Sequence, residues 1–357
     1  MFRILLGLDF LIFAISAINF FTIRVPRDKN AIDSSVTVLV PMRNEADNVH
    51  ECLTALAAQR GVSNLKVIII NDASTDQTLH FLHSAISGDS RFSVIDSPTL
   101  RQGWLGKVSA LQHGYEATHS EFIITLDADV RLQPDAIAYA VNQLDDLSLD
   151  FLSPYPRQIA LTFGEKLIQP ILHWSWMSTV ILRLSEKFPR RSTAVANGQF
   201  FVVRKPALDA IGGFTSVKNQ ILDDIELARS LIAAGCKGVV TEGSEIASTR
   251  MYATFNEIRQ GYGKSLWKAF GGPLGSIVAA IFIFATGILP VLLFLSGYSL
   301  GFILYIYIVL TRAMSAIRSR GNPMYAFLHP FSSALLIYLI AYSWAQRGSI
   351  QWKGRTV

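Results

Sequence analysis

Two aspartates separated by one alanine are the first feature of this sequence with chemical potential. Asp127 and Asp129 end the stretch "FIITLDADV" (residues 122–130), directly after a run of β-favouring apolar residues. Two carboxylates at that spacing can project the same way from a strand end and hold a divalent cation. They can equally be a solvated polar strand terminus. The stretch alone leaves both interpretations open.

Two other strand ends carry acidic and polar residues of the same kind. The first is "PMRNEADN", which follows the buried run "VTVLVP" (36–41), and the second is "NDASTD", which closes "KVIIIND" (66–72). Ligands gather at the carboxyl ends of the strands in parallel sheets. Three polar strand ends in one sheet therefore favour a binding site over simple solvation.

Strands alternate with helices through this part of the chain. Strands are expected at 36–41, 66–72, 91–97 and 122–130, with helices at 46–59, after Thr75, at 107–118 and after Pro134. Such alternation predicts right-handed crossovers and an α/β fold with a mainly parallel sheet flanked by helices. Neither GxGxxG nor GxxxxGK[ST] follows any strand, which argues against a dinucleotide-binding dehydrogenase and a P-loop NTPase. A nucleotide held through Mg²⁺ or Mn²⁺ remains compatible with the acidic strand ends.

The two ends of the chain are apolar, and half of the 357 residues are hydrophobic. The run from Ile4 to Ile23 is long enough for a retained transmembrane anchor. The runs 274–295 and 298–310 suit a helical hairpin, interrupted at Pro290. A last run, 331–344, either spans the membrane or lies in its interface. Aromatic residues near the ends of these runs fit a membrane-interface belt: Trp267, Tyr305, Tyr342, Trp344 and Trp352.

Basic residues predict the orientation. One cluster (Arg24, Arg27, Lys29) follows the first apolar run, and another (Arg312, Arg318, Arg320) follows the hairpin. Both should face the cytoplasm, which would place the middle domain there, at the inner cell membrane. Four spans would put the basic tail outside, and an interfacial last segment would resolve this conflict. Cys52 and Cys236 indicate neither a disulfide framework nor a zinc site. The net charge of +5 fits anionic lipid, and no motif supports nucleic acid.

The order of the motifs resembles family 2 glycosyltransferases, whose catalytic domain has the nucleotide-sugar-binding GT-A fold. The resemblance rests on "VPMRNEADNV", "INDASTDQT", "GWLGK", "LDADV", "NGQFFVVRKPALDAIGGF" (197–214) and "ILDDIELARSLIAAG" (221–235). It implies a catalytic domain over 33–250, after an anchor at 1–25. A juxtamembrane segment at 251–273, transmembrane helices over 274–346 and a basic tail at 347–357 would follow.

The resemblance implies a role for each matching residue. Asp129 would be the direct metal ligand, and Asp127 would share the metal or contact the donor's ribose. Asp224 would be the general base, although Asp223 replaces the family's usual Glu and leaves open which Asp acts. Donor-binding residues would be Pro41, Arg43, Asn44, Glu45, Asp72, Lys107 and Asp127, with Glu45 near the ribose or base and Asp72 at the base edge. A metal clamp stabilises a diphosphate leaving group, and a carboxylate takes the proton of an acceptor hydroxyl.

The segments outside the catalytic motifs narrow the expected acceptor. The QxxRW motif of processive synthases is absent, and "STRMYATFNEIRQGYGKSLWKAFGG" (248–272) stands in its place. Together with the tail "QWKGRTV", this segment resembles membrane glycosyltransferases of carotenoid and hopanoid pathways. The expected function is inverting transfer from a UDP- or GDP-sugar to a lipid. The alternatives are a processive polysaccharide synthase and a non-catalytic sugar-nucleotide-binding membrane protein.

Several residues keep a simpler interpretation beside the functional one. Lys107 could be a surface lysine, and Asp223 a helix cap. Arg250 and Arg259 could bind diphosphate or lipid headgroups, or could merely anchor the chain at the membrane. The stretch 163–188, broken by Pro170, is expected either in the membrane interface at the acceptor entrance or packed against the hairpin.

Overall fold

The computed structural model describes residues 2–86, 88–349 and 351–356. The chain forms two compact units. The sheet unit comprises Arg24–Arg157 and Leu184–Thr249, and the helical unit comprises Met1–Ile23, Gln158–Arg183 and Arg250–Val357. Of the segments discussed above, Ile350 and Val357 of the tail lie outside the described residues, as does the side chain of Trp352.

The sheet unit is built on a seven-stranded sheet with the order β3-β2-β1-β4-β8-β6-β9. Neighbouring strands are parallel except where β8 pairs with β4 and β6, so the predicted α/β class with a mainly parallel sheet is confirmed. The strands are β1 (Ile32–Met42), β2 (Val62–Asn71), β3 (Phe92–Asp96), β4 (Phe122–Leu126), β6 (Phe151–Tyr155), β8 (Phe200–Arg204) and β9 (Gly238–Glu242). A second sheet has the order β5-β10-β7, from Val130–Leu132, Ala247–Thr249 and Arg157–Gln158.

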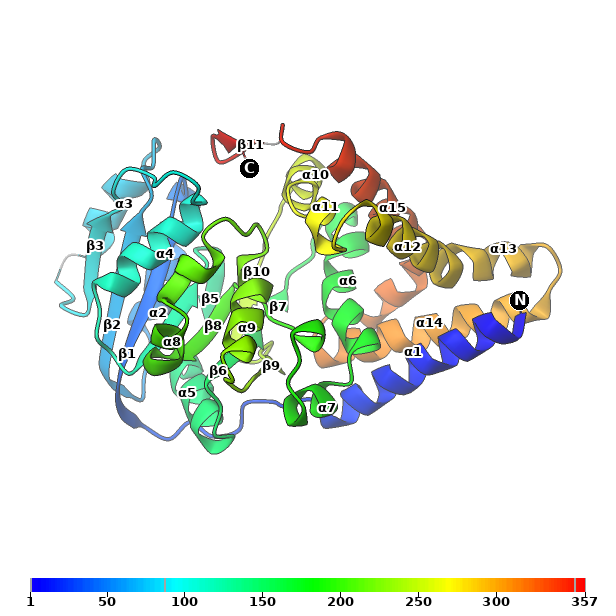
Figure 1. Ribbon diagram of the computed structural model, residues 1–357, viewed down its shortest axis with the longest axis horizontal. Helices are drawn as coiled ribbons and strands as arrows, with labels where there is room; N and C mark the ends of the chain where they lie inside the picture. Colours follow the sequence, from blue (N-terminus) through cyan, green and yellow to red (C-terminus); the bar gives the residue numbers. More distant parts are fainter. Residues whose placement is uncertain (1, 87, 350, 357) are drawn as a thin grey trace. The chain divides into compact units, whose positions relative to one another are not determined.

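Helices cover both faces of the large sheet (Figure 1). Val36, Val38 and Val40 of β1 pack in one buried cluster, and Leu39 packs in the other. This alternation arises because successive side chains of a strand point to opposite faces. The first face carries α2 (Ala46–Ala57), α3 (Thr78–Ala85) and α5 (Ala136–Asp146). The second carries α4 (Gly106–Glu116), α8 (Lys205–Ala210), the 3₁₀ turn η2 (Gly213–Val217) and α9 (Asp223–Ala233). The remaining short helices are α7 (Leu182–Lys187) and η1 (Arg191–Thr193).

One predicted strand is shorter than expected. The stretch 122–130 is not one strand, because β4 ends at Leu126 and β5 begins at Val130 in the other sheet. Asp127 and Asp129 therefore lie in a connection between two sheets, where the strand register does not dictate their directions. The expected helices at 46–59 and 107–118 are present with ends shifted by one or two residues.

The helical unit contains four helices that are long and apolar enough to cross a membrane: Arg3–Thr22, Pro273–Leu295, Ser299–Arg318 and Pro323–Ala345. Its elements are α1 (Phe2–Thr22), α6 (Phe163–Thr179), α10 (Phe255–Gly263), α11 (Leu266–Ala269), α12 (Pro273–Ile283), the π-helix η3 (Phe284–Ile288), α13 (Leu289–Leu295), α14 (Ser299–Arg318), η4 (Pro323–Leu328) and α15 (His329–Ala345). A hairpin of β11 (Gln351–Trp352) and β12 (Arg355–Thr356) follows.

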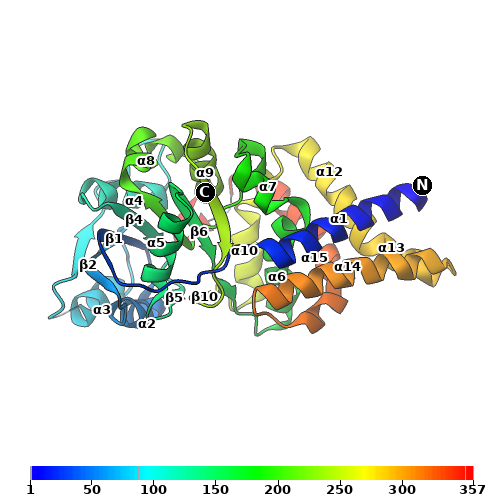
Figure 2. The same ribbon diagram turned by 90° about the horizontal axis from the view of Figure 1, so that it is seen from below.

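Helices α1 and α14 run side by side in the same direction (Figure 2). The Phe13 ring of α1 contacts the Tyr307 ring of α14. Further towards the C-terminal ends of both helices, Arg318 Nε donates to the Phe20 carbonyl at 2.8 Å. The C-terminal ends of these two helices therefore lie at the same end of the helical unit. Arg312 does not follow the hairpin: α14 continues through it, and its buried guanidinium lies over the Trp174 ring.

The last apolar segment enters and leaves the helical unit at one end. The turn η4, which precedes α15, lies beside α14, where Tyr305 donates to the Phe327 carbonyl at 3.0 Å. The C-terminal end of α15 lies beside the start of α12, where Trp344 Nε1 donates to Ser276 Oγ at 2.8 Å. The start of α12 and the end of α14 lie at the same end of the hairpin. Residues 319–345 therefore leave this end after α14 and come back to it at the end of α15. Tyr305 therefore lies partway along α14, away from the end of α15 where Trp267 and Trp344 pack together.

Helix α6 packs within the helical unit, which is the second of the two expected arrangements. Trp174 Nε1 donates to Thr311 Oγ1 of α14 at 2.8 Å, and His173 Nδ1 lies 2.7 Å from Ser315 Oγ. Asn19 of α1 is fully buried and donates to the carbonyls of Met177 and Val180 near the end of α6. Pro170 was expected to break this segment, but it lies inside a continuous helix.

Candidate active site

The Asp127–Asp129 turn is held from both sides by the sheet unit. The Asp127 N–H donates to the Gln199 carbonyl at 3.1 Å, directly before β8. Arg131 Nη1 donates to the Ala128 carbonyl at 2.7 Å, and its other nitrogens reach α2. Arg131 was not singled out from the sequence, because an arginine on a short strand carries no motif. It fixes the shape of the turn that presents the two carboxylates.

Lys107 lies between the carboxylates of Asp127 and Asp223. Its Nζ lies 2.7 Å from Asp127 Oδ1 and 3.9 Å from Asp223 Oδ2. Burial acts to lower the pKa of Lys107, but the charges of Asp127 and Asp223 outweigh it and raise the pKa. The ammonium therefore stays protonated. Residues 107, 127 and 223 come from three separate segments, and only the fold brings them together.

Asp224 is held by two backbone donors at the start of α9. Its Oδ2 accepts from the Gly198 N–H at 2.8 Å, and its Oδ1 accepts from the Ile225 N–H at 2.8 Å. Burial and the charge of Asp223 raise the pKa of Asp224 from the usual 3.8 to about 6, although Lys107 acts against this. Such a carboxylate is well placed to exchange a proton near neutral pH.

Gly198 allows this approach of the chain to Asp224. A Cβ at Gly198 would lie 3.1 Å from Asp224 Cβ and 3.5 Å from Lys107 Nζ. Any larger residue would have to displace one of the two charged side chains. The segment "NGQFF" belonged to the recognised motifs, but the role of this glycine is visible only in the structure.

The loops that follow β1 and β2 are joined through residues predicted to bind the donor. Arg43 Nη1 donates to the carbonyls of Asp72 and Ala73 at 2.7 and 2.9 Å. Asn44 accepts from the Thr75 N–H at 2.8 Å. Asn44 and Ala73 have φ values of +52° and +51°, a left-handed conformation that is uncommon outside glycine and that marks a constrained loop pair.

The remaining predicted donor residues lie at the same strand ends. Pro41 is opposite Ile70 in the β1–β2 register, and the buried Asp72 follows β2 directly, with its N–H donating to the Met42 carbonyl at 2.8 Å. The Glu45 N–H donates to Thr78 Oγ1 at 2.8 Å. The structure thus brings all the predicted site residues to the polar end of the parallel strands.

Asp127 and Asp129 have the chemistry that a divalent cation requires. Burial, followed by the charge of Asp127 and that of the nearby Glu45, raises the pKa of Asp129 to about 6, so a cation here would relieve an unfavourable concentration of negative charge. Residues 2–86, 88–349 and 351–356 contain no cluster of three or more His, Cys, Asp or Glu side chains that could hold a metal. Two carboxylates still fit, because Mg²⁺ and related ions are commonly held by one or two carboxylates together with substrate phosphates.

Comparisons with known proteins agree with this arrangement. Residues 37–212 match the family model described as Glycosyl transferase family 2. The 4,4'-diaponeurosporenoate glycosyltransferases of Staphylococcus aureus strains MRSA252 and bovine RF122 / ET3-1 are each 26% identical over 337 residues, covering 90% of this chain and 88% of the relative. Among solved structures, a mannosyltransferase (PcManGT) from Pyrobaculum calidifontis in complex with GDP-Man and Mn²⁺ has a TM-score of 0.52, with 17% identity and 99% coverage of both chains.

The family model spans the strands and loops that carry the residues predicted to bind a donor, and the solved structure has the same fold. Residues 37–212 of this chain therefore form a family 2 glycosyltransferase domain with the GT-A fold.

Proposed function

We propose that this chain is a membrane-anchored, inverting glycosyltransferase that moves a sugar from a nucleotide-sugar donor to a lipid. The observation that carries the proposal is the array around Lys107, with Asp127 on one side and the pair Asp223 and Asp224 on the other. One end of this array suits a diphosphate and its metal, and the other suits an acceptor.

On the donor side, Asp129 and Asp127 would hold Mg²⁺ or Mn²⁺. When bound, the ion supplies Lewis-acid stabilisation of the charge that builds on the leaving diphosphate. Lys107 is already protonated there and adds a second positive charge. Pro41, Arg43, Asn44, Glu45 and Asp72 would line the nucleotide pocket, with the joined β1 and β2 loops as its wall.

On the acceptor side, Asp224 would take the proton of an attacking hydroxyl. Its two backbone hydrogen bonds fix its orientation, and a pKa of about 6 leaves it ionised at neutral pH. Asp223 would tune that pKa. One base and no second nucleophile correspond to a single displacement, which inverts the anomeric carbon. If the acceptor is a carboxylate, Asp224 would orient it rather than deprotonate it.

The choice of donor and acceptor is supported by the relatives. The similar mannosyltransferase was solved with GDP-Man and Mn²⁺, which supports a nucleotide sugar, either GDP- or UDP-linked. The Staphylococcus aureus relatives are named for 4,4'-diaponeurosporenoate, and the ending of that name denotes a carboxylate. The apolar helices of this chain favour an acceptor that resides in the membrane.

The proposed location is the inner cell membrane, with the catalytic domain in the cytoplasm. Arg24, Arg27 and Lys29 follow α1 in the sequence. Arg318 is the last residue of α14, Arg320 follows it, and α1 and α14 end at the same end of the helical unit. Positive residues concentrate on the cytoplasmic side. If residues 319–345 turn back within the membrane, the basic tail would face the cytoplasm as well, and the conflict of a four-span count would not arise.

The test is transfer of a labelled sugar from UDP- and GDP-sugars by the purified full-length protein in lipid nanodiscs with Mn²⁺. We expect Asp129→Asn and excess chelator each to abolish transfer, and the exposed control Asp146→Asn to keep it. Full activity of Asp129→Asn would refute the metal assignment. A single glycolipid product would support this proposal, a ladder of lengths would indicate a processive synthase, and donor binding without turnover would indicate a sensor.

A further inference from the structure

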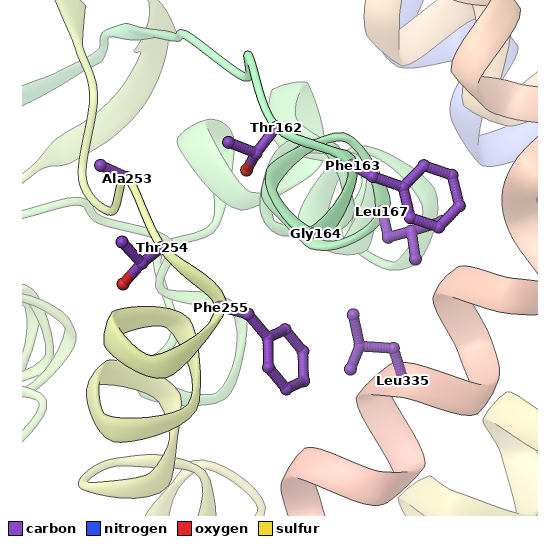
Figure 3. A pocket seen from close by; sticks show the side chains of 8 residues that line it. All are labelled: Thr162, Phe163, Gly164, Leu167, Ala253, Thr254, Phe255 and Leu335. Carbon is purple, nitrogen blue, oxygen red and sulfur yellow. The ribbon is translucent and has the colours of Figure 1, made fainter.

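An apolar pocket of about 450 Å³ lies within the helical unit (Figure 3). Its walls are residues 162–164 and Leu167 at the start of α6, residues 253–255 at the start of α10, and Leu335 of α15. This volume is within the range of pockets that hold small-molecule ligands. None of the proposed catalytic residues belongs to it.

The lining is suited to hydrocarbon. Among the described residues that line the pocket, none carries a charge, and Phe163, Leu167, Phe255 and Leu335 provide the side-chain surface. The Thr254 hydroxyl caps α10 by accepting from the Glu257 N–H, and Thr162 is engaged in the capping box of α6. The lining hydroxyls are thus occupied by helix ends, so a ligand gains nothing there from polar groups.

The walls of the pocket are tied together by an ion pair between the buried Glu165 and the exposed Arg250. The fully buried Glu165 side chain accepts from the Leu161 N–H at 3.0 Å and from Arg250 Nε at 2.8 Å. Burial acts to raise the pKa of Glu165, but the hydrogen bonds from Arg250 and Thr162 outweigh it and lower the pKa. One carboxylate therefore ties the segment before α6 to the segment before α10, and these are two of the three walls.

One wall of the pocket, Leu335, lies on α15 at some distance from a tryptophan pair at the end of that helix. Trp344 and Trp267 pack together at the end of α15, as residues of a membrane-interface belt do. Leu335 precedes Trp344 by nine positions on the same helix, which corresponds to about 13 Å along the helix axis. Phe163 and Phe255 are 64% and 49% exposed, so the pocket rim is apolar as well.

Cations gather around the belt end of the same elements. Arg347 lies over the Trp344 ring, and Arg259 of α10 lies over the Tyr342 ring. Arg250 precedes the pocket residue Ala253 by three positions. An apolar pocket on elements that also carry these arginines is complementary to an amphiphile with a long chain and an anionic or polar end. The Thr249 hydroxyl acts to lower the pKa of Asp129. The pocket residue Ala253 follows Thr249 by four positions in the sequence.

We propose that this pocket binds the hydrocarbon chain of the acceptor lipid, an inference that rests on the glycosyl-transfer function proposed above. The pocket would select acceptors with a long apolar chain and fix that chain. Glu165 and Arg250 would act as positioning residues that keep the walls in place.

The first experiment locates the hydrocarbon chain of the bound lipid directly and does not depend on sugar transfer. Full-length protein in nanodiscs is photolysed with a long-chain carboxylic acid that carries a diazirine on its chain, and labelled peptides are identified by mass spectrometry. We expect labels within residues 162–167, 253–255 or at Leu335, and loss of most labelling in the pocket-filling variant Leu335→Trp. The matched control is Leu274→Trp, since Leu274 is 76% exposed on α12 and outside the pocket.

The second experiment measures transfer to long-chain acceptors. We expect Leu335→Trp to lower kcat/KM for the long-chain acceptor at least tenfold, with retained affinity for the donor nucleotide as the check on folding, and Leu274→Trp to behave as wild type. Labels elsewhere, or a Leu335→Trp variant with normal transfer, would overturn this inference and leave the proposed function unaffected.

A wild-type protein that transfers no sugar would refute the proposed function, while the labelling would still test the pocket. If a diazirine phospholipid labels the pocket and the acceptor does not compete, the pocket holds a structural lipid and the acceptor assignment is wrong.

Discussion

Removal of the Asp223 charge should change how the reaction depends on pH. Burial and the charge of Asp223 raise the pKa of Asp224 to about 6, and Asp224 must be ionised to act as a base. With a hydroxyl acceptor, kcat/KM should therefore fall below pH 6 and level off above about pH 7. Asp223→Asn keeps the size of the side chain and removes the like charge, so the pKa of Asp224 should fall.

The expected size of the shift follows from the coupling of neighbouring charges. A nearby like charge commonly moves a carboxylate pKa by about one unit, equivalent to about 1.4 kcal/mol. A base with a pKa of about 6 is about 9% ionised at pH 5, whereas one with a pKa of about 5 is about 50% ionised. The rate at pH 5, relative to the plateau, should thus rise roughly fivefold in Asp223→Asn, even if the plateau itself is lower.

The assay is kcat/KM for labelled sugar transfer between pH 4.5 and 8.5, with saturating Mn²⁺ so that Asp129 stays ionised. The control is Glu226→Gln, which removes a carboxylate from the same helix turn, where Glu226 pairs with Arg229 at 2.6 Å. The fall of kcat/KM at acidic pH in Glu226→Gln should coincide with that of wild type. An unmoved or upward-shifted limb in Asp223→Asn, or substantial activity in Asp224→Asn, would refute the assignment of Asp224 as the base tuned by Asp223.

Two further substitutions test the packing around the site and within the helical unit. Gly198→Ala should lower kcat about tenfold with donor affinity retained, because the new Cβ would lie 3.1 Å from Asp224 Cβ and displace that side chain; unchanged kcat would contradict the close approach. Asn19→Leu should destabilise the protein by about 2 kcal/mol, because it removes three hydrogen bonds to the backbone around the end of α6. A lower thermal unfolding midpoint in detergent checks this, with the exposed Thr22→Ala as control, and an unchanged midpoint would show that those groups find other partners.

Much of the sheet unit was predictable from sequence because the signals are local. The buried strands and the amphipathic helices between them follow from side-chain periodicity, which a strand or helix imposes on its own residues. The acidic strand ends could be placed at one edge of the sheet for the same reason. The strand at 122–130 was predicted too long, because an apolar run followed by Val130 reads as continuous until the second sheet is known.

The helical unit shows the limit of hydropathy. Length and apolarity identify four candidate spans, yet they do not show that residues 319–345 turn back beside α14 and α12. Length and apolarity also suggested that the second helix of the hairpin ends before Arg312. In the structure α14 continues through Arg312, whose guanidinium lies over the Trp174 ring. A hydropathy pattern records the average surroundings of a residue and carries no information about which helix provides them.

The sequence by itself determined the family resemblance of the sheet unit, the alternation of strands and helices over its first four predicted strands, and which carboxylates end those strands. Only the tertiary structure decided that Lys107 joins Asp127 to Asp223, that two backbone N–H groups hold Asp224, and that Arg131 shapes the Asp127–Asp129 turn. The physical reason is the distance along the chain. Local structure depends on neighbours a few residues away, but Lys107 is 20 positions from Asp127 and 116 from Asp223, and Gly198 is 26 positions from Asp224. Only the packing of the helices on the sheet brings such segments within a few ångströms.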